Sequence, residues 1–240
     1  MVTGLTPAHH GVTGNDDIAA DTQPLLAATI FDLAHDAGRR SALFVGKSKL
    51  RALIHPISET SASVPPTGQV WLADAVAANV VKYFSTTSQR PELVFIHLPD
   101  VDIAGHASGW MSDDYRSAVL RVDAALDKIL QRIQASYGTD VTIIVTADHG
   151  GINFSHDNAL NESRQIPWIA WGRGVHTQII ASPVRIVDLA PTVLWLLGVS
   201  VPTNIDGSPV TQAFQAPGAA GALHAASLRD AASLATAGTH

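Results

Sequence analysis

The six residues from Val141 to Thr146 (VTIIVT) constrain the fold most, because they form one continuous apolar run. Such a run is typical of a parallel strand that is covered on both faces. It leads directly into Asp148 and His149, which are followed by two glycines that permit unusual backbone dihedrals. Open α/β sheets place their sites at the carboxyl ends of strands, so we expect a functional turn here.

The rest of the chain alternates predicted strands with predicted helices. Strands are expected at residues 41–46, 93–98 and 168–171, and helices at 24–37, 70–84, 113–133 and 187–197. Residues 1–23 and 56–68 are rich in turn-forming residue types and are predicted to be loops. This alternation predicts an α/β fold with a mostly parallel central sheet and helices on both faces.

The chain has 240 residues, of which 46% are hydrophobic, so a large core can be buried. Residues 1–215 are predicted to form one α/β domain. Residues 216–240 are mostly Ala, Gly, Ser and His and are predicted to be a poorly ordered tail.

Charge and residue usage limit the partners. The formal net charge of −6 argues against non-specific binding to nucleic acid or to an anionic membrane. A small anionic substrate stays possible, because a bound metal would reverse the local field. The chain has no cysteine, so any metal must use histidine and carboxylate ligands. No apolar run approaches the roughly 20 residues that span a bilayer, and the first residues do not resemble a signal peptide.

Three clusters of ligand-type residues follow predicted strands. In the first, a four-residue spacing puts a carboxylate and an imidazole on one side of a helical turn. The second is the aspartate–histidine pair after the apolar run, and the third is a histidine in the next loop. The predicted metal ligands are Asp102, His106, Asp148, His149 and His156, with Asp100 as a weaker alternative to Asp102.

Any one such residue is more often a turn or capping residue, but five of them at strand ends make coincidence much less frequent. Two carboxylates and three imidazoles suit Zn²⁺ or Mn²⁺ better than Mg²⁺ or Ca²⁺. An Asp/His/His set with one open position also matches catalytic zinc. The other histidines are interpreted as surface, core or tail residues: His9, His10, His35, His55, His97, His176, His224 and His240.

At these residues the chain resembles the alkaline phosphatase superfamily, and within it the type I phosphodiesterase/nucleotide pyrophosphatase branch. The resemblance covers residues 1–215. The motifs that carry it are VTGLTPAHHGVTGN at the start, DIAGHASGW at 102–110, TADHGG at 146–151, SHDN with IPWIAWGRGV, and DLAPTVLWLLGV at 188–199.

The resemblance implies two metal sites. One metal would take Asp102, His106 and His156, and the second would take Asp148 and His149. In the family the second metal also takes an aspartate from the first strand and a Thr or Ser nucleophile. That segment precedes the stretch matching VTGLTPAHHG, so the family nucleophile is expected to lie outside this chain, and Thr3 and Thr6 match positions after it.

The expected function is metal-dependent hydrolysis of phosphoesters, with phosphodiesters first and phosphotriesters or monoesters as further candidates. One or two Zn²⁺ ions are expected, with Mn²⁺ as the alternative, and metal-bound hydroxide would replace the family nucleophile. The alternative is a non-catalytic metal-binding relative or an inactive fragment of a phosphodiesterase. A phosphoglycerate mutase-like relative is a further enzymatic alternative, whereas a sulfatase is disfavoured by the lack of cysteine.

The expected partner is a small anionic phosphoester. A homo-oligomer is also expected, because the family's first strand lies beside the strand that ends at Asp148, and its loss would expose a sheet edge. Asp16, Asp17 or a partner chain could complete the second metal site. Trp110 could stack on an aromatic leaving group or be a packing residue. The compartment stays open, since family relatives are often exported.

Overall fold

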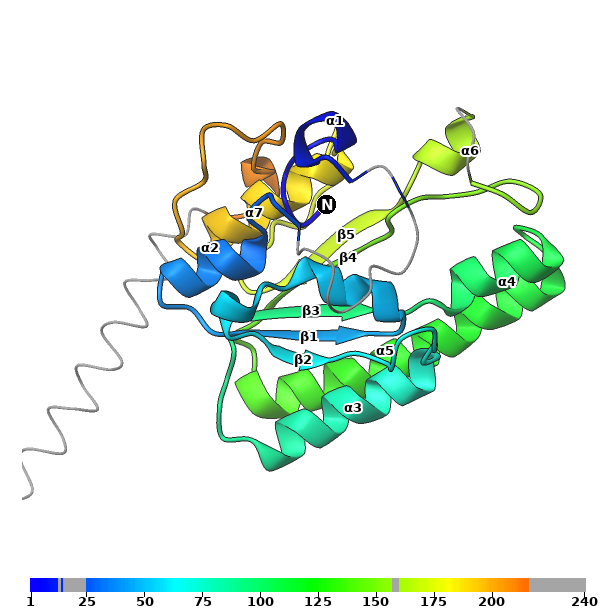
Figure 1. Cartoon of the computed structure of the whole chain (residues 1–240), viewed down its shortest axis with the longest axis horizontal. Coiled ribbons are helices and arrows are strands. Elements are labelled where there is room, and N and C mark those ends of the chain that lie inside the picture. The colour runs from blue at the N-terminus through cyan, green and yellow to red at the C-terminus, as the bar shows by residue number, and fades with distance from the viewer. Residues whose placement is uncertain (13, 15–24, 157–159, 216–240) are drawn as a thin grey trace, which may run out of the picture.

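The computed structural model describes residues 1–12, 14, 25–156 and 160–215 (Figure 1). The strands are β1 (Ser41–Val45), β2 (Ser61–Ser63), β3 (Leu93–His97), β4 (Thr142–Thr146) and β5 (Trp168–Gly172). The α-helices are α1 (Pro7–His10), α2 (Ile30–Asp36), α3 (Ala73–Thr86), α4 (Asp100–Ser108), α5 (Asp113–Tyr137), α6 (Asn161–Arg164) and α7 (Leu189–Leu196). Short 3-10 helices are η1 (Ser48–Leu53), η2 (Pro56–Ser58), η3 (Ile186–Asp188) and η4 (Thr211–Ala213).

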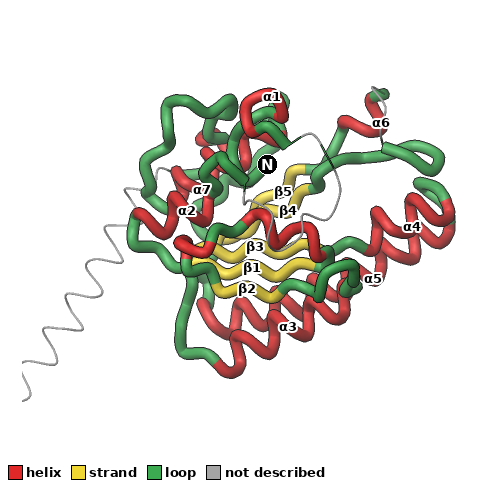
Figure 2. The backbone as a smooth tube through the Cα atoms, in the orientation of Figure 1, coloured by secondary structure: helices red, strands yellow, loops and turns green. Residues whose placement is uncertain are grey.

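The strands form two sheets. Three parallel strands have the order β2-β1-β3, and β4 pairs antiparallel with β5. Helices α3 and α5 cover one face of the parallel sheet, whereas α2 and α7 lie on the other side (Figure 2). The predicted α/β class with helices on both faces is therefore confirmed. All described strand pairs are parallel except β4-β5.

Strand β1 separates two hydrophobic cores. Its five residues are all buried, and successive side chains of a strand point to opposite faces. Ala42 and Phe44 pack with α3 and α5, whereas Leu43 and Val45 pack with α2 and α7. A strand buried on both faces has to be apolar throughout, which explains why the segment SALFV has no polar-apolar alternation.

Helix α5 is the longest element and matches the predicted helix at 113–133, extended to Tyr137. The Ser112 side chain accepts a hydrogen bond from the Tyr115 N–H and so caps the first turn. Gly138 ends the helix with a φ of 63°, a conformation that favours glycine. The extra turn is stabilised by Tyr137, whose hydroxyl donates to the Pro91 carbonyl.

Several elements differ from the prediction. Strand β4 pairs antiparallel with β5 and is only partly buried, although its apolar run predicted a parallel strand covered on both faces. Helix α1 lies inside the predicted loop 1–23. Helix α2 begins at Ile30, not at residue 24, because Thr29 and Asp32 form a reciprocal capping box that fixes the helix start. Strand β2 lies inside the predicted loop 56–68, where three residues pair with β1 although the segment has no apolar pattern. A short edge strand is held by backbone hydrogen bonds, so side-chain periodicity does not reveal it.

The predicted tail at 216–240 lies outside the described residues, and the single-domain assignment for 1–215 stays a prediction. No helix in the described part of the chain is long and apolar enough to cross a bilayer.

Asp100 links the start of α4 to the start of α3. It is 4% exposed, and its Oδ2 accepts a hydrogen bond from the Ala73 N–H at 2.7 Å. The Asp100 carboxylate thus satisfies a backbone N–H at the start of α3 and caps that helix. It therefore fixes where α4, which carries Asp102, leaves the sheet.

We predict that Asp100→Ala lowers the free energy of unfolding by about 1–2 kcal/mol, because the Ala73 N–H loses its acceptor. Urea denaturation measures this loss. Asp74→Ala is the matched control, since that side chain is 71% exposed and its ion pair with Lys128 contributes little. Equal stability of the two variants would contradict the capping role.

Candidate metal centre

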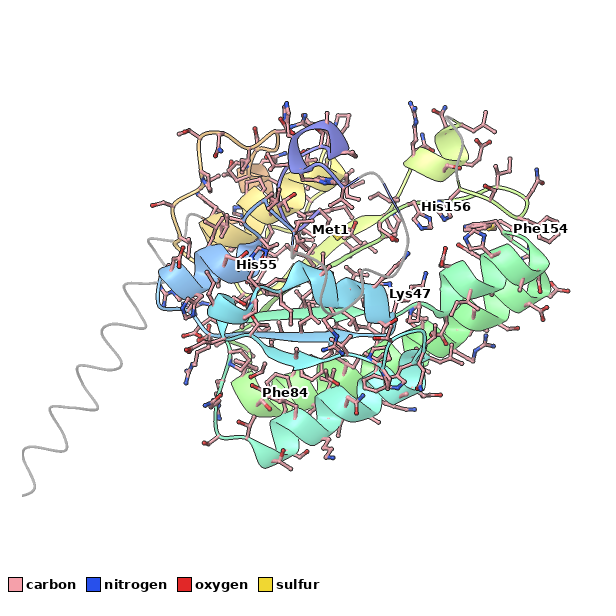
Figure 3. All side chains as sticks on the ribbon, in the orientation of Figure 1. Met1, Lys47, His55, Phe84, Phe154 and His156 are labelled. Carbon is pink, nitrogen blue, oxygen red and sulfur yellow. The ribbon has the colours of Figure 1, made fainter. Side chains whose placement is uncertain are left out.

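The predicted ligands follow the carboxyl ends of β3 and β4. Figure 3 labels His156 of this set, on the side of the molecule where Lys47 and Phe154 also lie. Asp102 and His106 lie on α4, which follows β3. Asp148 and His149 follow β4, and His156 lies in the next loop. Open α/β sheets place their sites at the carboxyl ends of strands, as these residues are placed.

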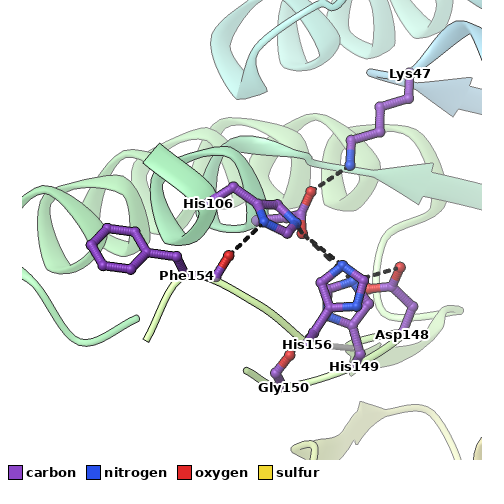
Figure 4. A network of polar contacts seen from close by, with 8 residues as sticks. Lys47, His106, Asp148, His149, Gly150, Phe154 and His156 are labelled. Carbon is purple, nitrogen blue, oxygen red and sulfur yellow. Dashed lines mark hydrogen bonds and ion pairs between the residues drawn. The ribbon is translucent and has the colours of Figure 1, made fainter. Parts of the chain in front are cut away.

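The carboxylate of Asp102 lies at the centre of this site, surrounded by residues that Figure 4 labels. Its Oδ1 lies 3.4 Å from the His106 Nε2, 3.6 Å from the His149 Nε2 and 3.9 Å from the His156 Nε2. Its side chain is 20% exposed. One ring nitrogen of His149, one of His156 and a carboxylate oxygen of Asp102 all lie within 4.8 Å of one another, close enough to share one cation.

Backbone carbonyls orient two of the imidazoles. The His106 Nδ1 lies 2.9 Å from the Phe154 carbonyl, and the His149 Nδ1 lies 2.8 Å from the Gly150 carbonyl. A carbonyl only accepts, so each Nδ1 carries the proton, and in the neutral ring the lone pair is on Nε2. This is the tautomer that binds a metal through Nε2, with a carbonyl as the outer partner.

The donor set fits a divalent cation. The Asp102 Oδ1 is shielded from solvent and has no hydrogen-bond partner among the described residues. It faces imidazole nitrogens at distances too long for hydrogen bonds. Lone pairs that converge on a buried carboxylate oxygen need a positive charge between them, and one carboxylate with two or three imidazoles is a zinc-type ligand set.

The rings of His149 and His156 support this interpretation. They are stacked with centroids 3.7 Å apart and an interplanar angle of 21°. The stack brings a ring nitrogen of each histidine within 4.8 Å of the other and of an Asp102 oxygen.

Lys47 also contacts this cluster, although the sequence motifs did not single it out. Its Nζ donates to the Asp102 Oδ2 at 2.5 Å. Burial opposes ionisation of Asp102, but the Lys47 hydrogen bond and charge, together with nearby imidazoles, lower its pKa overall. One feature of the sequence could have indicated this role: Lys47 follows the buried strand β1 by two residues, at the end of the sheet where sites occur.

Asp148 lies at the rim of the cluster. Its side chain is 65% exposed, and its Oδ2 is 3.6 Å from the His149 Nε2. The His149 Nε2 is equally far, 3.6 Å, from the Asp102 Oδ1, which the two-site division assigned to the other metal. That division stays a prediction, as do the individual ligand assignments.

The remaining candidates have other contacts or are not described. The Thr3 Oγ1 accepts from the Leu5 N–H, and the Thr6 Oγ1 donates to Asp206. Both hydroxyls thus take part in hydrogen bonds outside the cluster. Asp16 and Asp17 lie outside the described residues.

His97 ends β3 beside the cluster. Its Nδ1 is shielded from solvent and has no hydrogen-bond partner among the described residues. Burial lowers the pKa of His97 to about 4, and the opposing charge of Asp148 recovers only part of that shift. His97 therefore stays neutral down to about pH 4, whereas a surface histidine with a pKa of about 6.5 is mostly protonated at about pH 5.

Comparison with known proteins identifies the family. The family model described as type I phosphodiesterase / nucleotide pyrophosphatase matches residues 1–182. This match spans most of the chain and includes all five predicted ligands. The chain belongs to the type I phosphodiesterase/nucleotide pyrophosphatase family. Members of this family depend on metal ions, in agreement with the histidine and aspartate cluster.

Several curated proteins of known name are similar in sequence to part of this chain. GPI ethanolamine phosphate transferase 1 of Emericella nidulans is 26% identical over 191 residues, covering 61% of this chain and 20% of the relative. The human protein of that name is 28% identical over 166 residues, covering 57% and 18%. The 2,3-bisphosphoglycerate-independent phosphoglycerate mutase of Wolbachia pipientis wMel is 31% identical over 127 residues, covering 50% and 24%. The chain thus spans about a fifth of the length of these relatives.

Solved structures confirm the fold. The phosphonate monoester hydrolase of Silicibacter pomeroyi superposes with a TM-score of 0.60 at 14% identity, covering 87% of this chain and 64% of that chain. The phosphonate monoester hydrolase of Agrobacterium radiobacter has a TM-score of 0.57 at 14% identity, with coverage of 87% and 65%. These neighbours place the family member in the alkaline-phosphatase-like fold.

We predict that stability of the metal-free protein falls as the pH drops from about 6.5 to 4. The unfolded chain binds a proton at His97 in this range, with a reference pKa of about 6.5, whereas the folded chain does not. Proton binding by the unfolded chain at His97 is expected to lower the free energy of unfolding by roughly 2–4 kcal/mol between about pH 6.5 and pH 4. Above about pH 6.5 this loss is absent, because neither state binds the proton. Urea denaturation at several pH values measures it.

His97→Gln should flatten this pH dependence, because the titrating group is removed. His176→Gln is the control, since His176 is an exposed histidine. An unchanged slope in the His97 variant would show that other groups cause the acid destabilisation.

Proposed function

We propose that this chain is a metal-dependent hydrolase of phosphoesters, with phosphodiesters as the first substrate class and phosphotriesters and monoesters as further candidates. We also propose Zn²⁺ as the metal, in one or two copies, with Mn²⁺ as the alternative. The observation that carries the proposal is the convergence of three imidazole Nε2 atoms on the unpaired Asp102 Oδ1. Family membership supports the reaction class.

Asp102, His149 and His156 would hold the ion, with His106 as a further ligand and Asp148 at the rim. A divalent ion held there supplies Lewis-acid polarisation of a phosphoryl oxygen and lets water act as the nucleophile near neutral pH. The Phe154 and Gly150 carbonyls keep the His106 and His149 rings in the required tautomer.

Lys47 would bind the phosphoryl group. Its ammonium already reaches the Asp102 carboxylate at 2.5 Å, and its side chain is 22% exposed. A cation at this position attracts the anionic ester and orients a phosphoryl oxygen toward the cluster. In a chain with a net charge of −6, this local positive charge favours anionic substrates.

Metal removal and ligand substitution test the proposal. Purified protein is expected to contain zinc by elemental analysis and to hydrolyse bis(p-nitrophenyl) phosphate, and chelation should abolish turnover until zinc is restored. His149→Ala and His156→Ala should each lower turnover at least roughly 10–100-fold, the loss typical for partners of a metal site. His176→Ala is the matched control, because His176 is exposed and on a different segment.

Two outcomes would favour other functions. Bound zinc without turnover would favour a non-catalytic metal-binding relative. Two of the relatives named above are phosphate transferases, so we also propose phosphotransfer as a second candidate. It predicts that an added primary alcohol is converted to its phosphoester in the same assay. Turnover that survives both histidine substitutions would refute the metal cluster as the catalytic site.

The role of Lys47 gives a separate prediction. Lys47→Met should raise the KM for an anionic phosphodiester roughly 10-fold, since an attraction of about 1–1.5 kcal/mol at a partly exposed site is lost. The KM for a neutral phosphotriester should change little. Lys82→Met is the control for lost charge, because Lys82 is exposed on α3. Equal effects on both substrates would contradict charge recognition by Lys47.

We propose in addition that the protein forms a homo-oligomer. Strand β3 pairs only with β1, and β4 pairs only with β5, so each leaves a backbone edge without a strand partner in the described part of the chain. Such edges are stabilised when another strand or chain covers them. Light scattering at micromolar concentration should give the mass of an oligomer, and a monomer would refute the proposal.

A further inference from the structure

Trp110 lies between the two segments that carry the predicted ligands. A Cβ atom added to Gly105 in α4 would lie 2.8 Å from carbon atoms of the indole. A Cβ atom added to Gly151, in the loop after β4, would lie 2.1 Å from the indole Cε2. Since real Cβ atoms do not approach so closely, the indole packs directly against both glycine backbones.

The same indole contacts the imidazoles. The ring centroid of Trp110 is 5.1 Å from that of His106, with an edge-to-face angle of 86°. It is 6.0 Å from His156 and 6.5 Å from His149. One side chain therefore touches rings from both ligand-bearing segments, in geometries that aromatic pairs favour.

The backbone around Trp110 is also fixed. The Trp110 N–H donates to the Asn153 carbonyl at 2.6 Å, which ties the end of α4 to the loop before His156. Met111 and Asn153 have φ angles of 66° and 52°, unusual for residues with a side chain. Strain of this kind persists only where surrounding contacts hold it, and it concentrates at functional sites.

We infer that Trp110 is a positioning residue: its indole sets the spacing between the segment of Asp102 and His106 and the segment of His149 and His156. This inference rests on the proposed metal-binding function. It explains both glycines, because any side chain at residue 105 or 151 would displace the indole. Of the two roles that the sequence left open for Trp110, the inference favours packing within the site over stacking on a leaving group.

Zinc titration by calorimetry tests the inference on the full chain. Trp110→Ala should weaken zinc binding about 10–100-fold, as expected for loss of an outer partner that orients ligands. Trp110→Phe should lose less, since a smaller ring fills part of the space. Trp195→Phe is the matched control, because Trp195 packs in the separate cluster around Phe214.

Gly105→Ala is an independent test, because helix propensity alone predicts that this change stabilises α4. Alanine in a helix is normally more stable than glycine by about 1 kcal/mol. Here the added methyl group meets the indole, so zinc affinity should fall as it does in Trp110→Ala. Zinc affinity equal to wild type in both variants would overturn the inference.

A metal-free readout separates this inference from the proposed function. In isotope-labelled protein, the nuclear Overhauser contacts between the rings of His106 and His156, whose centroids lie 5.0 Å apart, should be lost in Trp110→Ala and kept in Trp195→Phe. If wild type binds no zinc but these contacts are lost, the proposed function fails and the positioning role stands. If zinc binds but neither its affinity nor these contacts respond to Trp110→Ala, the positioning role fails alone.

Discussion

The burial of β1 on both faces is the constraint on which the rest of the structure depends. Five consecutive buried residues divide the molecule into two cores, one with α3 and α5 and the other with α2 and α7. Because β3 runs parallel to β1, the residues that follow both strands emerge at the same end. Lys47 and Asp102 meet there, and the Asp100 cap on α3 fixes the exit of the chain toward α4.

The electrostatics of that end follow from one carboxylate. Asp102 has two oxygens with different surroundings: Oδ2 accepts from the Lys47 ammonium, whereas Oδ1 faces imidazole nitrogens without a hydrogen bond. Partial burial strengthens both interactions, because charges shielded from water are less screened. The first oxygen is satisfied by the protein, and the second is arranged for a cation. The site thus places a donor set that could hold a metal beside the positive charge of Lys47.

Packing around glycine connects the helix and loop that carry these ligands. Trp110 packs against Gly105 and Gly151. Asp102 and Asp148 follow strands of two different sheets, since β3 and β4 share no ladder in the described residues. Side-chain packing around Trp110 therefore joins two segments that no shared backbone ladder connects.

The sequence by itself determined the fold class and most elements. Continuous apolar runs identified β1, β3 and β4, and the three-to-four residue spacing identified α5, because both patterns follow from local geometry and burial. The motifs around Asp102 and His149 identified the family. Sequence could not determine the short β2, the start of α2 or the site roles of Lys47 and Trp110. Those depend on backbone pairing, capping and contacts between residues far apart in the chain, and only the tertiary structure decided which side chains meet.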